Sequence, residues 1–213
     1  MKKLTYLLLA IVIMIMCIGC SQPLSDDDDS EDTSPSEKVE LSRGKISGDV
    51  YKNKYLGLEF IKPESWVYST DEEIAAVIDL GAETLLGENF QEALDNNPSI
   101  YDMMVVDTIT RSSVSVGYEN LAQTLSTNIT ERQYAEAVKS QLSGVTGVSF
   151  TFEDYQTVQL GDTEFLCLSG STVMNGVSMK QIYYMHKTDG YMAFIIVTIP
   201  SGYTVSEIEA MFK

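Results

Sequence analysis

The segment TEFLCLSGSTVMNGVSMKQIYYMHKTDGYMAFIIVTI, residues 163–199, decides the fold of this chain. It holds three runs rich in β-branched and aromatic residues, joined by Asn175-Gly176 and Asp189-Gly190. Short links of residues that tolerate positive φ are typical of tight hairpins. A further β-type run precedes Gly161-Asp162, which is a link of the same kind. We therefore expect a C-terminal four-stranded antiparallel meander, with strands at 149–160, 163–173, 177–187 and 191–199.

The residues before the meander contain more strands. Residues 50–63, VYKNKYLGLEFIKP, read as a hairpin of two short runs separated at positions 52–54, with Leu56, Leu58 and Phe60 alternating along the second run. Trp66 follows, where it can cap the core. Two more strands are expected at 103–111 and 113–118, and the apolar MMVV of the first suits a central position in a sheet.

Helical patterns lie between and after these strands. Thr130 and Gln133 form a capping box that begins a helix ending at Gly144, and Thr204 and Glu207 begin a short C-terminal helix over 204–213. Two other helices are expected, at 71–80 and 89–95. Helices grouped around an antiparallel sheet predict an α+β fold, and no glycine-rich phosphate loop follows any strand.

The N-terminus has the layout of a secretory signal. Lys2 and Lys3 precede an apolar run over 4–18, which is shorter than the roughly 20 residues that a membrane-spanning helix needs. The run ends in Cys17-Ile18-Gly19-Cys20, which resembles the bacterial lipobox, although Cys17 stands where Leu is usual. The resemblance implies a signal peptide over 1–19 that is removed, and lipidation of Cys20 by acyl chains that anchor the protein in the membrane.

Residues 20–44 then form an acidic tether. This segment is dominated by Ser, Asp, Glu and Pro, including the run DDDD at 26–29, and it cannot bury enough apolar surface to fold. The globular domain is expected at 45–213. The chain has a formal charge of −17; residues 45–213 carry −13 once the +2 of Lys2 and Lys3 and the −6 of residues 21–44 are set aside. Such an acidic domain excludes nucleic acid as a partner.

Residues 51–66, YKNKYLGLEFIKPESW, resemble the opening of the PsbP-like fold. Shared features are an aromatic residue, an Asn, a strand that begins with Gly, and then Pro and Trp66; the order of elements up to residue 213 is similar as well. The resemblance implies an antiparallel sheet covered by helices on its two faces, an α/β/α sandwich. It also implies an accessory or binding role with no shared catalytic centre. Metal-binding histidines of plant members have no counterparts here, because the domain has only His186.

The residues that carry chemistry are few. The domain has one His (His186) and one Cys (Cys167), too few for a zinc site, and Cys167 lies in an apolar run typical of a buried, inert thiol. No G-x-S-x-G nucleophile elbow occurs. We therefore expect no catalytic residue, no metal and no cofactor. Paired carboxylates remain as an alternative, a hydrolase acting on envelope polymers.

These observations predict a lipid-anchored protein on the extracytoplasmic face of the cell membrane. Its domain is expected to act without catalysis, as a binding or assembly protein whose partner is an envelope protein or a small ligand. Tyrosine is enriched at interfaces, and six tyrosines are candidates for such a surface: Tyr118, Tyr155, Tyr183, Tyr184, Tyr191 and Tyr203.

Overall fold

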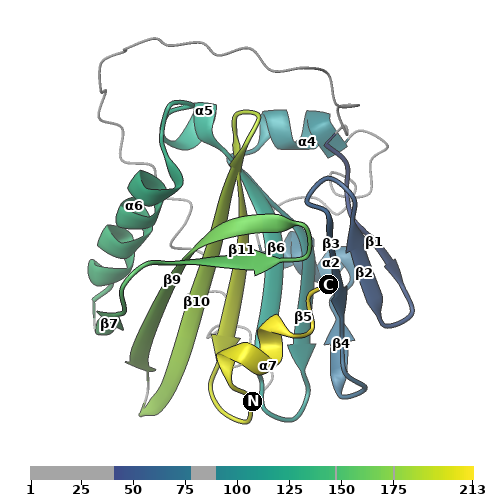
Figure 1. Cartoon of the computed structure of the whole chain (residues 1–213), viewed down its shortest axis with the longest axis vertical. Coiled ribbons are helices and arrows are strands. Elements are labelled where there is room, and N and C mark those ends of the chain that lie inside the picture. The colour runs from purple at the N-terminus through teal and green to yellow at the C-terminus, as the bar shows by residue number, and fades with distance from the viewer. Residues whose placement is uncertain (1–40, 78–89, 147, 175) are drawn as a thin grey trace.

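The structure is a computed structural model that describes residues 41–77, 90–146, 148–174 and 176–213. Its centre is a large, fully antiparallel sheet (Figure 1). Seven of its strands lie in the order β4-β5-β6-β11-β10-β9-β7, and β8 pairs with β9 on the same side as β7. The strands are β4 (Trp66–Tyr68), β5 (Ser99–Asp107), β6 (Ser113–Asn120), β7 (Phe150–Phe152), β8 (Gln156–Leu160), β9 (Thr163–Met174), β10 (Val177–Thr188) and β11 (Tyr191–Ile199).

A second, smaller sheet is formed by β1 (Lys45–Ser47), β2 (Val50–Asn53) and β3 (Leu58–Ile61). The last residues of the chain extend it, since the backbone N–H of Lys213 donates to the carbonyl of Glu59 at 2.8 Å and the ring of Phe212 packs on Phe60. The predicted hairpin over 50–63 is therefore confirmed. Its turn lies at 54–57 and not at 52–54, because the side chain of Asn53 accepts a hydrogen bond from the backbone of Leu56.

The helices are α2 (Asp71–Val77), α4 (Phe90–Asn96), α5 (Leu121–Thr124), α6 (Glu131–Ser143) and α7 (Val205–Glu209). The capping boxes at Thr130 and Thr204 are both confirmed. Residues 78–80 of the helix expected at 71–80, Gly81 and Asn89 lie outside the described residues. The C-terminal helix is shorter than predicted, because residues after Glu209 turn back to pair with β3.

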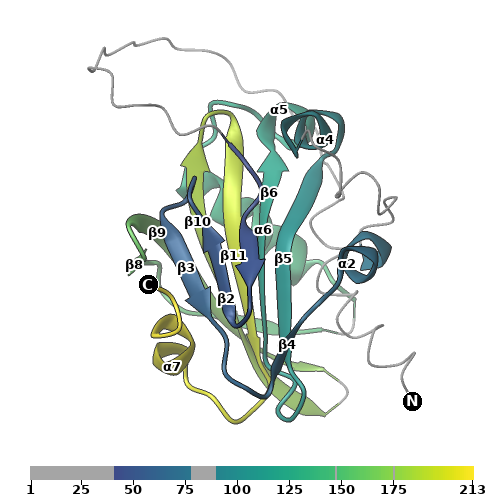
Figure 2. The ribbon, with the colours of Figure 1, turned by 90° about the vertical axis from the view of Figure 1, so that its right-hand side faces the viewer.

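The two faces of the large sheet are covered by different layers (Figure 2). Tyr118 and Glu119 are neighbours on β6 and so point to opposite faces. Tyr118 meets Asn53 of the small sheet, whereas Glu119 meets Tyr134 of α6. α7 lies on the same side as the small sheet, since Tyr184 of β10 donates to Glu209. The α+β fold with an antiparallel sheet covered on both faces is thus confirmed.

The four-stranded meander is confirmed from residue 163 onward, and its hairpin residues have positive φ at Gly161 and at Asp189-Gly190. The single strand predicted at 149–160 is wrong. It is divided into β7 and β8, because the register against β9 shifts by one residue between Phe152, which lies opposite Gly170, and Gln156, which lies opposite Cys167.

The strand predicted at 103–111 is displaced. It begins at Ser99 and ends at Asp107, whose carboxylate accepts hydrogen bonds from the backbone N–H groups of Ile109 and Thr110. Such a turn, closed by an Asp side chain, ends the strand early. Trp66 is buried as predicted, with its Nε1 donating to the hydroxyl of Tyr203 at 3.0 Å.

Candidate functional site

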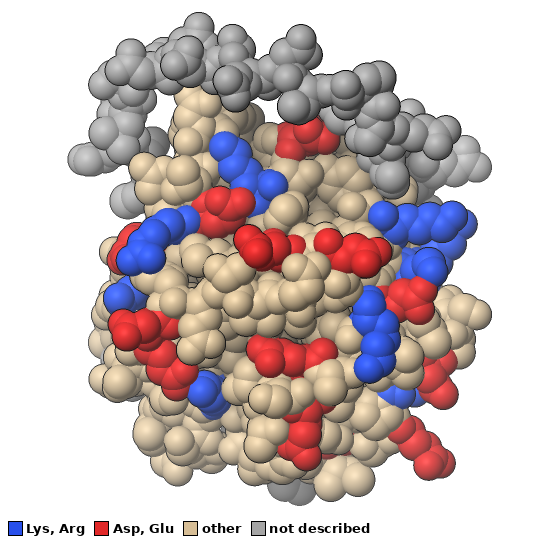
Figure 3. Space-filling view, viewed as in Figure 1, with Lys and Arg blue, Asp and Glu red and all other residues tan. Residues whose placement is uncertain are grey.

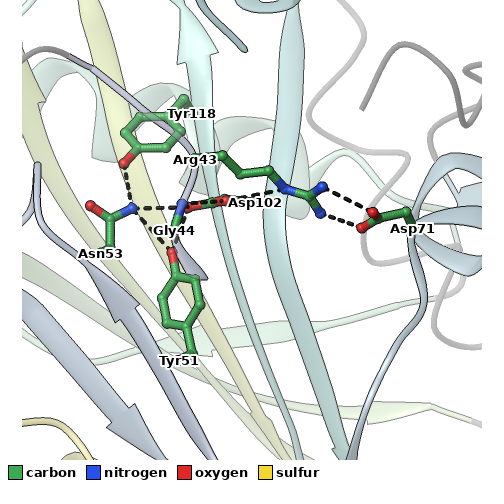
Figure 4. Close-up of polar contacts among 7 residues, drawn as sticks. All are labelled: Arg43, Gly44, Tyr51, Asn53, Asp71, Asp102 and Tyr118. Atoms are coloured by element: carbon green, nitrogen blue, oxygen red, sulfur yellow. Dashed lines mark hydrogen bonds and ion pairs between the residues drawn. The ribbon is translucent and has the colours of Figure 1, made fainter. Parts of the chain in front are cut away.

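The most distinctive polar group of the domain is the carboxylate of Asp102, which is buried in the middle of β5 between apolar neighbours. The register of β5 against β6 shifts between Tyr101 and Met103, which marks a β-bulge at Asp102. A bulge re-aims side chains. Here it directs Asp102 toward the small sheet, where its Oδ2 accepts hydrogen bonds from the hydroxyl of Tyr51 at 2.5 Å and from Nδ2 of Asn53 at 2.9 Å (Figure 4).

The partners of Asp102 come from β2 because Tyr51 and Asn53 are two residues apart and share one face of that strand. The side-chain amide of Asn53 also donates to the hydroxyl of Tyr118 at 2.9 Å, and its Oδ1 accepts from the backbone of Leu56. One buried Asn therefore ties the turn of the small sheet to β5 and β6 of the large sheet.

The chain that leads into the domain reaches the same carboxylate. The backbone N–H of Gly44 donates to both oxygens of Asp102 at 3.0 Å. A Cβ at position 44 would lie 2.3 Å from the ring of Tyr51, so only glycine fits there. Arg43 places its Nε 3.6 Å from Asp102 and pairs its guanidinium with Asp71 at the start of α2. We call these contacts of Arg43 and Gly44 with Asp102 and Asp71 the junction.

The electrostatics of the junction follow from burial. Desolvation raises the pKa of Asp102, against the lowering effect of the hydrogen bonds from Tyr51 and Gly44 and of the charge of Arg43. Burial, followed by the nearby charge of Asp102, raises the pKa of Tyr51 well above its usual value, so this phenol is a neutral donor. At Asp71, which is partly exposed, the hydrogen bond from Arg43 lowers the pKa.

The junction therefore acts as an anchor. Each oxygen of Asp102 already accepts hydrogen bonds from the protein, and its side chain is 0 % exposed. The sequence placed residues 41–44 in the tether, but Leu41 packs against the core and Arg43 and Gly44 are fixed on the large sheet.

A second buried carboxylate, that of Glu119, lies on the opposite face of the large sheet, which α6 covers. Glu119 of β6 accepts a 2.5 Å hydrogen bond from the hydroxyl of Tyr134 on α6, and burial raises its pKa. Tyr134 lies on the first turn of α6, the helix whose start the capping box at Thr130 predicts. The pair fixes α6 against the sheet.

The two residues singled out for chemistry have structural surroundings. Cys167 is a buried free thiol, and burial raises its pKa to about 11. His186 lies near the end of β10, where its Nδ1 contacts the carbonyl oxygen of Glu164 at 3.0 Å and its ring tilts on Phe165. The expected buried thiol and locally hydrogen-bonded imidazole are both present.

Half of the predicted interface tyrosines are in the core, and for these residues the prediction was wrong. Tyr184 faces α7, Tyr183 at the adjacent position of β10 points to the opposite face of the sheet, and Tyr118 faces the small sheet; all three are buried. Both faces of these central strands are covered, so a tyrosine on either face is buried.

The other three tyrosines are partly exposed and already have partners. Tyr155 lies under the guanidinium of Arg132, 4.4 Å from the ring centroid. Tyr191 receives a hydrogen bond from Gln91 at 2.5 Å, and Tyr203 accepts one from Trp66. These rings are separated over different elements and do not form one surface.

Cys20 and the signal peptide expected over 1–19 lie outside the described residues. Within the described ranges no group of three or more His, Cys, Asp or Glu side chains could hold a metal ion. None of the helices in that part of the chain is long and apolar enough to cross a membrane.

Comparisons with known proteins add little to these observations. No protein-family model matches the chain, and neither does any curated protein sequence. Among solved structures, cyanobacterial PsbP from Synechocystis sp. PCC 6803 is similar at 12% identity, with a TM-score of 0.45 over 84% of this chain and 97% of that one. A protein from Bacteroides thetaiotaomicron is similar at 11% identity and a TM-score of 0.38, over 74% of this chain and 44% of that one. Neither likeness carries an argument about ligands or partners.

Proposed function

We propose that this protein is a lipoprotein that displays a noncatalytic binding or assembly domain on the extracytoplasmic face of the cell membrane. Its signal peptide over 1–19 is removed and Cys20 receives acyl chains. The proposal is carried by the sequence Cys17-Ile18-Gly19-Cys20 after a basic and apolar leader. Acyl chains on Cys20 replace any need for a membrane-binding surface on the domain, because each buried methylene contributes about 0.8 kcal/mol.

The junction supports a display role. The chain joins the domain at Arg43 and Gly44, which are fixed on the large sheet through Asp102. A chain from Cys20 to Arg43 can span at most about 80 Å at full extension. A membrane anchor at Cys20 would thus hold the domain within that distance of the bilayer and always by the same point of its surface.

The decisive experiment is metabolic labelling with an alkyne-modified fatty acid in bacterial cells that express the full chain. Wild-type protein should incorporate the label and remain with the membrane, whereas Cys20→Ser should lose both. Cys17→Leu is the matched control, because it removes the neighbouring thiol and restores the residue that is usual in a lipobox. Equal labelling of wild-type protein and Cys20→Ser would refute lipidation at this residue.

The side of the membrane is tested separately by adding a protease to intact spheroplasts. The wild-type domain should be degraded while a cytoplasmic marker survives. Protection of the domain until the spheroplasts are lysed would contradict the extracytoplasmic location.

A further inference from the structure

The outer edge of β8 is the feature of the surface whose chemistry is best suited to a partner. β8 pairs with β9 on one side only, from Gln156 opposite Cys167 to Leu160 opposite Thr163. Its other side faces away from the sheet, and Gln156, Thr157 and Gln159 are exposed. We call this side the β8 edge. An open sheet edge is a template for pairing with another chain.

The free main-chain groups of the β8 edge follow from its register. The two-residue turn at Gly161-Asp162 is closed by Leu160 and Thr163, which are therefore a hydrogen-bonded pair of the ladder. Hydrogen-bonded pairs alternate along an antiparallel ladder, so the backbone N–H and C=O groups of Val158 and Gln156 also point toward β9. The backbone N–H and C=O groups of Thr157 and Gln159 point outward, and they have no backbone partner within the described ranges.

The side chains of β8 keep its edge open to pairing. The strand reads QTVQL, without a charged residue or a proline. Charged residues, prolines and bulges are the usual devices that block edge-to-edge association. The break between β7 and β8 limits the open edge to a short segment of five residues.

Exposed acids flank this neutral segment. Asp154 precedes it, and Asp162 and Glu164 follow it, all three exposed and without an ion pair in the part of the chain that the structure describes. Glu153, by contrast, forms an ion pair with Lys180, with 2.9 Å between Oε1 and Nζ. In the view of Figure 3, acidic side chains lie around an uncharged band in the middle of the face, where Figure 1 draws β8 and β9.

The flanking acids distinguish between possible occupants. In a twofold antiparallel pairing centred on Val158, Asp162 of one copy would lie opposite Asp154 of the other. Like charges that face each other across strands are destabilising, so a second copy is disfavoured. A segment with cationic residues at its ends would instead place them beside Asp154 and beside Asp162 and Glu164.

We propose that the β8 edge binds, by addition of a β-strand, an extended segment of another protein that has an uncharged β-branched centre and Lys or Arg at its ends. This inference rests on the proposed binding role and names its site and the class of its partner. Main-chain hydrogen bonds of Thr157 and Gln159 hold the added strand, and the flanking acids favour a segment with positively charged ends.

The probe is a fluorescein-labelled peptide, Lys-Thr-Val-Thr-Val-Thr-Lys, titrated with the full-length protein in detergent and followed by fluorescence anisotropy. The matched peptide Glu-Thr-Val-Thr-Val-Thr-Glu has the same centre and the opposite charge. We expect the Lys peptide to bind at least about tenfold more tightly, and its affinity to fall as salt screens the acids.

Two substitutions at one position separate main-chain from side-chain recognition. Thr157→Pro removes an outward N–H at an edge position where proline is tolerated, and we expect it to weaken binding of the Lys peptide at least about tenfold. Thr157→Val keeps the N–H and should bind within about twofold of wild type. Asp162→Asn with Glu164→Gln leaves the strand intact and should weaken binding about threefold to tenfold, with loss of the salt dependence.

Circular dichroism establishes that each variant is folded. Equal affinity of Thr157→Pro and wild type, equal affinity for the two peptides, or no binding up to about 1 mM peptide would each overturn strand addition at this edge. Dimerisation in sedimentation that Thr157→Pro abolishes would show that a second copy is the occupant, and would also overturn it. None of these results affects the fatty-acid labelling of Cys20, so the two proposals fail separately.

Discussion

Replacing Asp102 by Ala tests the junction most directly. The substitution leaves the hydroxyl of Tyr51 and the backbone N–H of Gly44 without their acceptor. An unsatisfied buried donor costs about 1–3 kcal/mol. The side-chain amide of Asn53 also loses one acceptor, but at a smaller cost in free energy, because the hydroxyls of Tyr51 and Tyr118 still accept its hydrogen bonds. Loss of the buried charge offsets part of the cost, so we expect a decrease of about 3 kcal/mol in the free energy of unfolding, a factor of roughly 150 in the equilibrium constant.

The assay is urea denaturation followed by the fluorescence of Trp66, the one tryptophan of the chain. Asp49→Ala is the matched control, since it makes the same change in charge and size at an exposed carboxylate that pairs with Lys62. Exposed pairs contribute about 0–1 kcal/mol, so the control should remain close to wild type.

Hydrogen exchange gives a local readout of the same variant. The backbone amide of Gly44 should lose protection from exchange in Asp102→Ala, whereas amides in the centre of β10 and β11 should still exchange only when the whole domain unfolds. A decrease in stability no larger than that of Asp49→Ala, with Gly44 still protected, would refute the account of the junction.

Three further predictions concern the core. Between the raised pKa of folded Asp102 and its ordinary value of 3.8, falling pH should stabilise the wild type relative to Asp102→Asn, because the folded state takes up the proton first; denaturation at a series of pH values measures this. Gly117→Ala should cost about 3 kcal/mol or more in thermal unfolding, because its Cβ would lie 2.6 Å from the carbonyl oxygen of Ile100 and 2.5 Å from the ring of Phe194. In a chain carrying Cys17→Ser and Cys20→Ser, Cys167 should not react with Ellman's reagent at about pH 8 unless the protein is unfolded, since it is buried and its pKa is raised to about 11.

Each of these predictions has its own control. If the stability of the wild type relative to Asp102→Asn falls or stays constant as the pH is lowered, the direction of the pKa shift is contradicted. Gly176→Ala, where φ is +79° and the space is open, should cost only about 1 kcal/mol, so equal melting of the two alanine variants would contradict the packing at Gly117. Rapid modification of native Cys167 would show that its strand opens readily.

The sequence predicted those parts of the fold whose signals are local. The turns at Gly161-Asp162 and Asp189-Gly190 and the caps at Thr130 and Thr204 act through neighbouring residues, and all four lie where expected. The break between β7 and β8 was missed because it is a one-residue shift in the pairing with β9, and the residues of one strand do not specify how it pairs with another.

The junction could not be predicted from residue spacing. Asp102 faces the small sheet only because of a β-bulge, and simple alternation from Met103 would have put it on the other face. One signal was present: an Asp inside the apolar run SIYDMMVV is unusual and requires a buried partner. Alternation also could not distinguish exposed from buried tyrosines, because both faces of β10 are covered.

The position of the junction has a mechanical consequence. A force that pulls on the chain N-terminal to Leu41 meets the packing of Leu41 and the contacts of Arg43 and Gly44 with Asp102 and Asp71 before it reaches the ladder between Lys45 and Lys52. The contacts of the junction thus protect the pairing of β1 with β2 from the applied force. When the domain is pulled by the chain that precedes Leu41, the first rupture would occur in these contacts, and the β-sheets would remain intact until they give way.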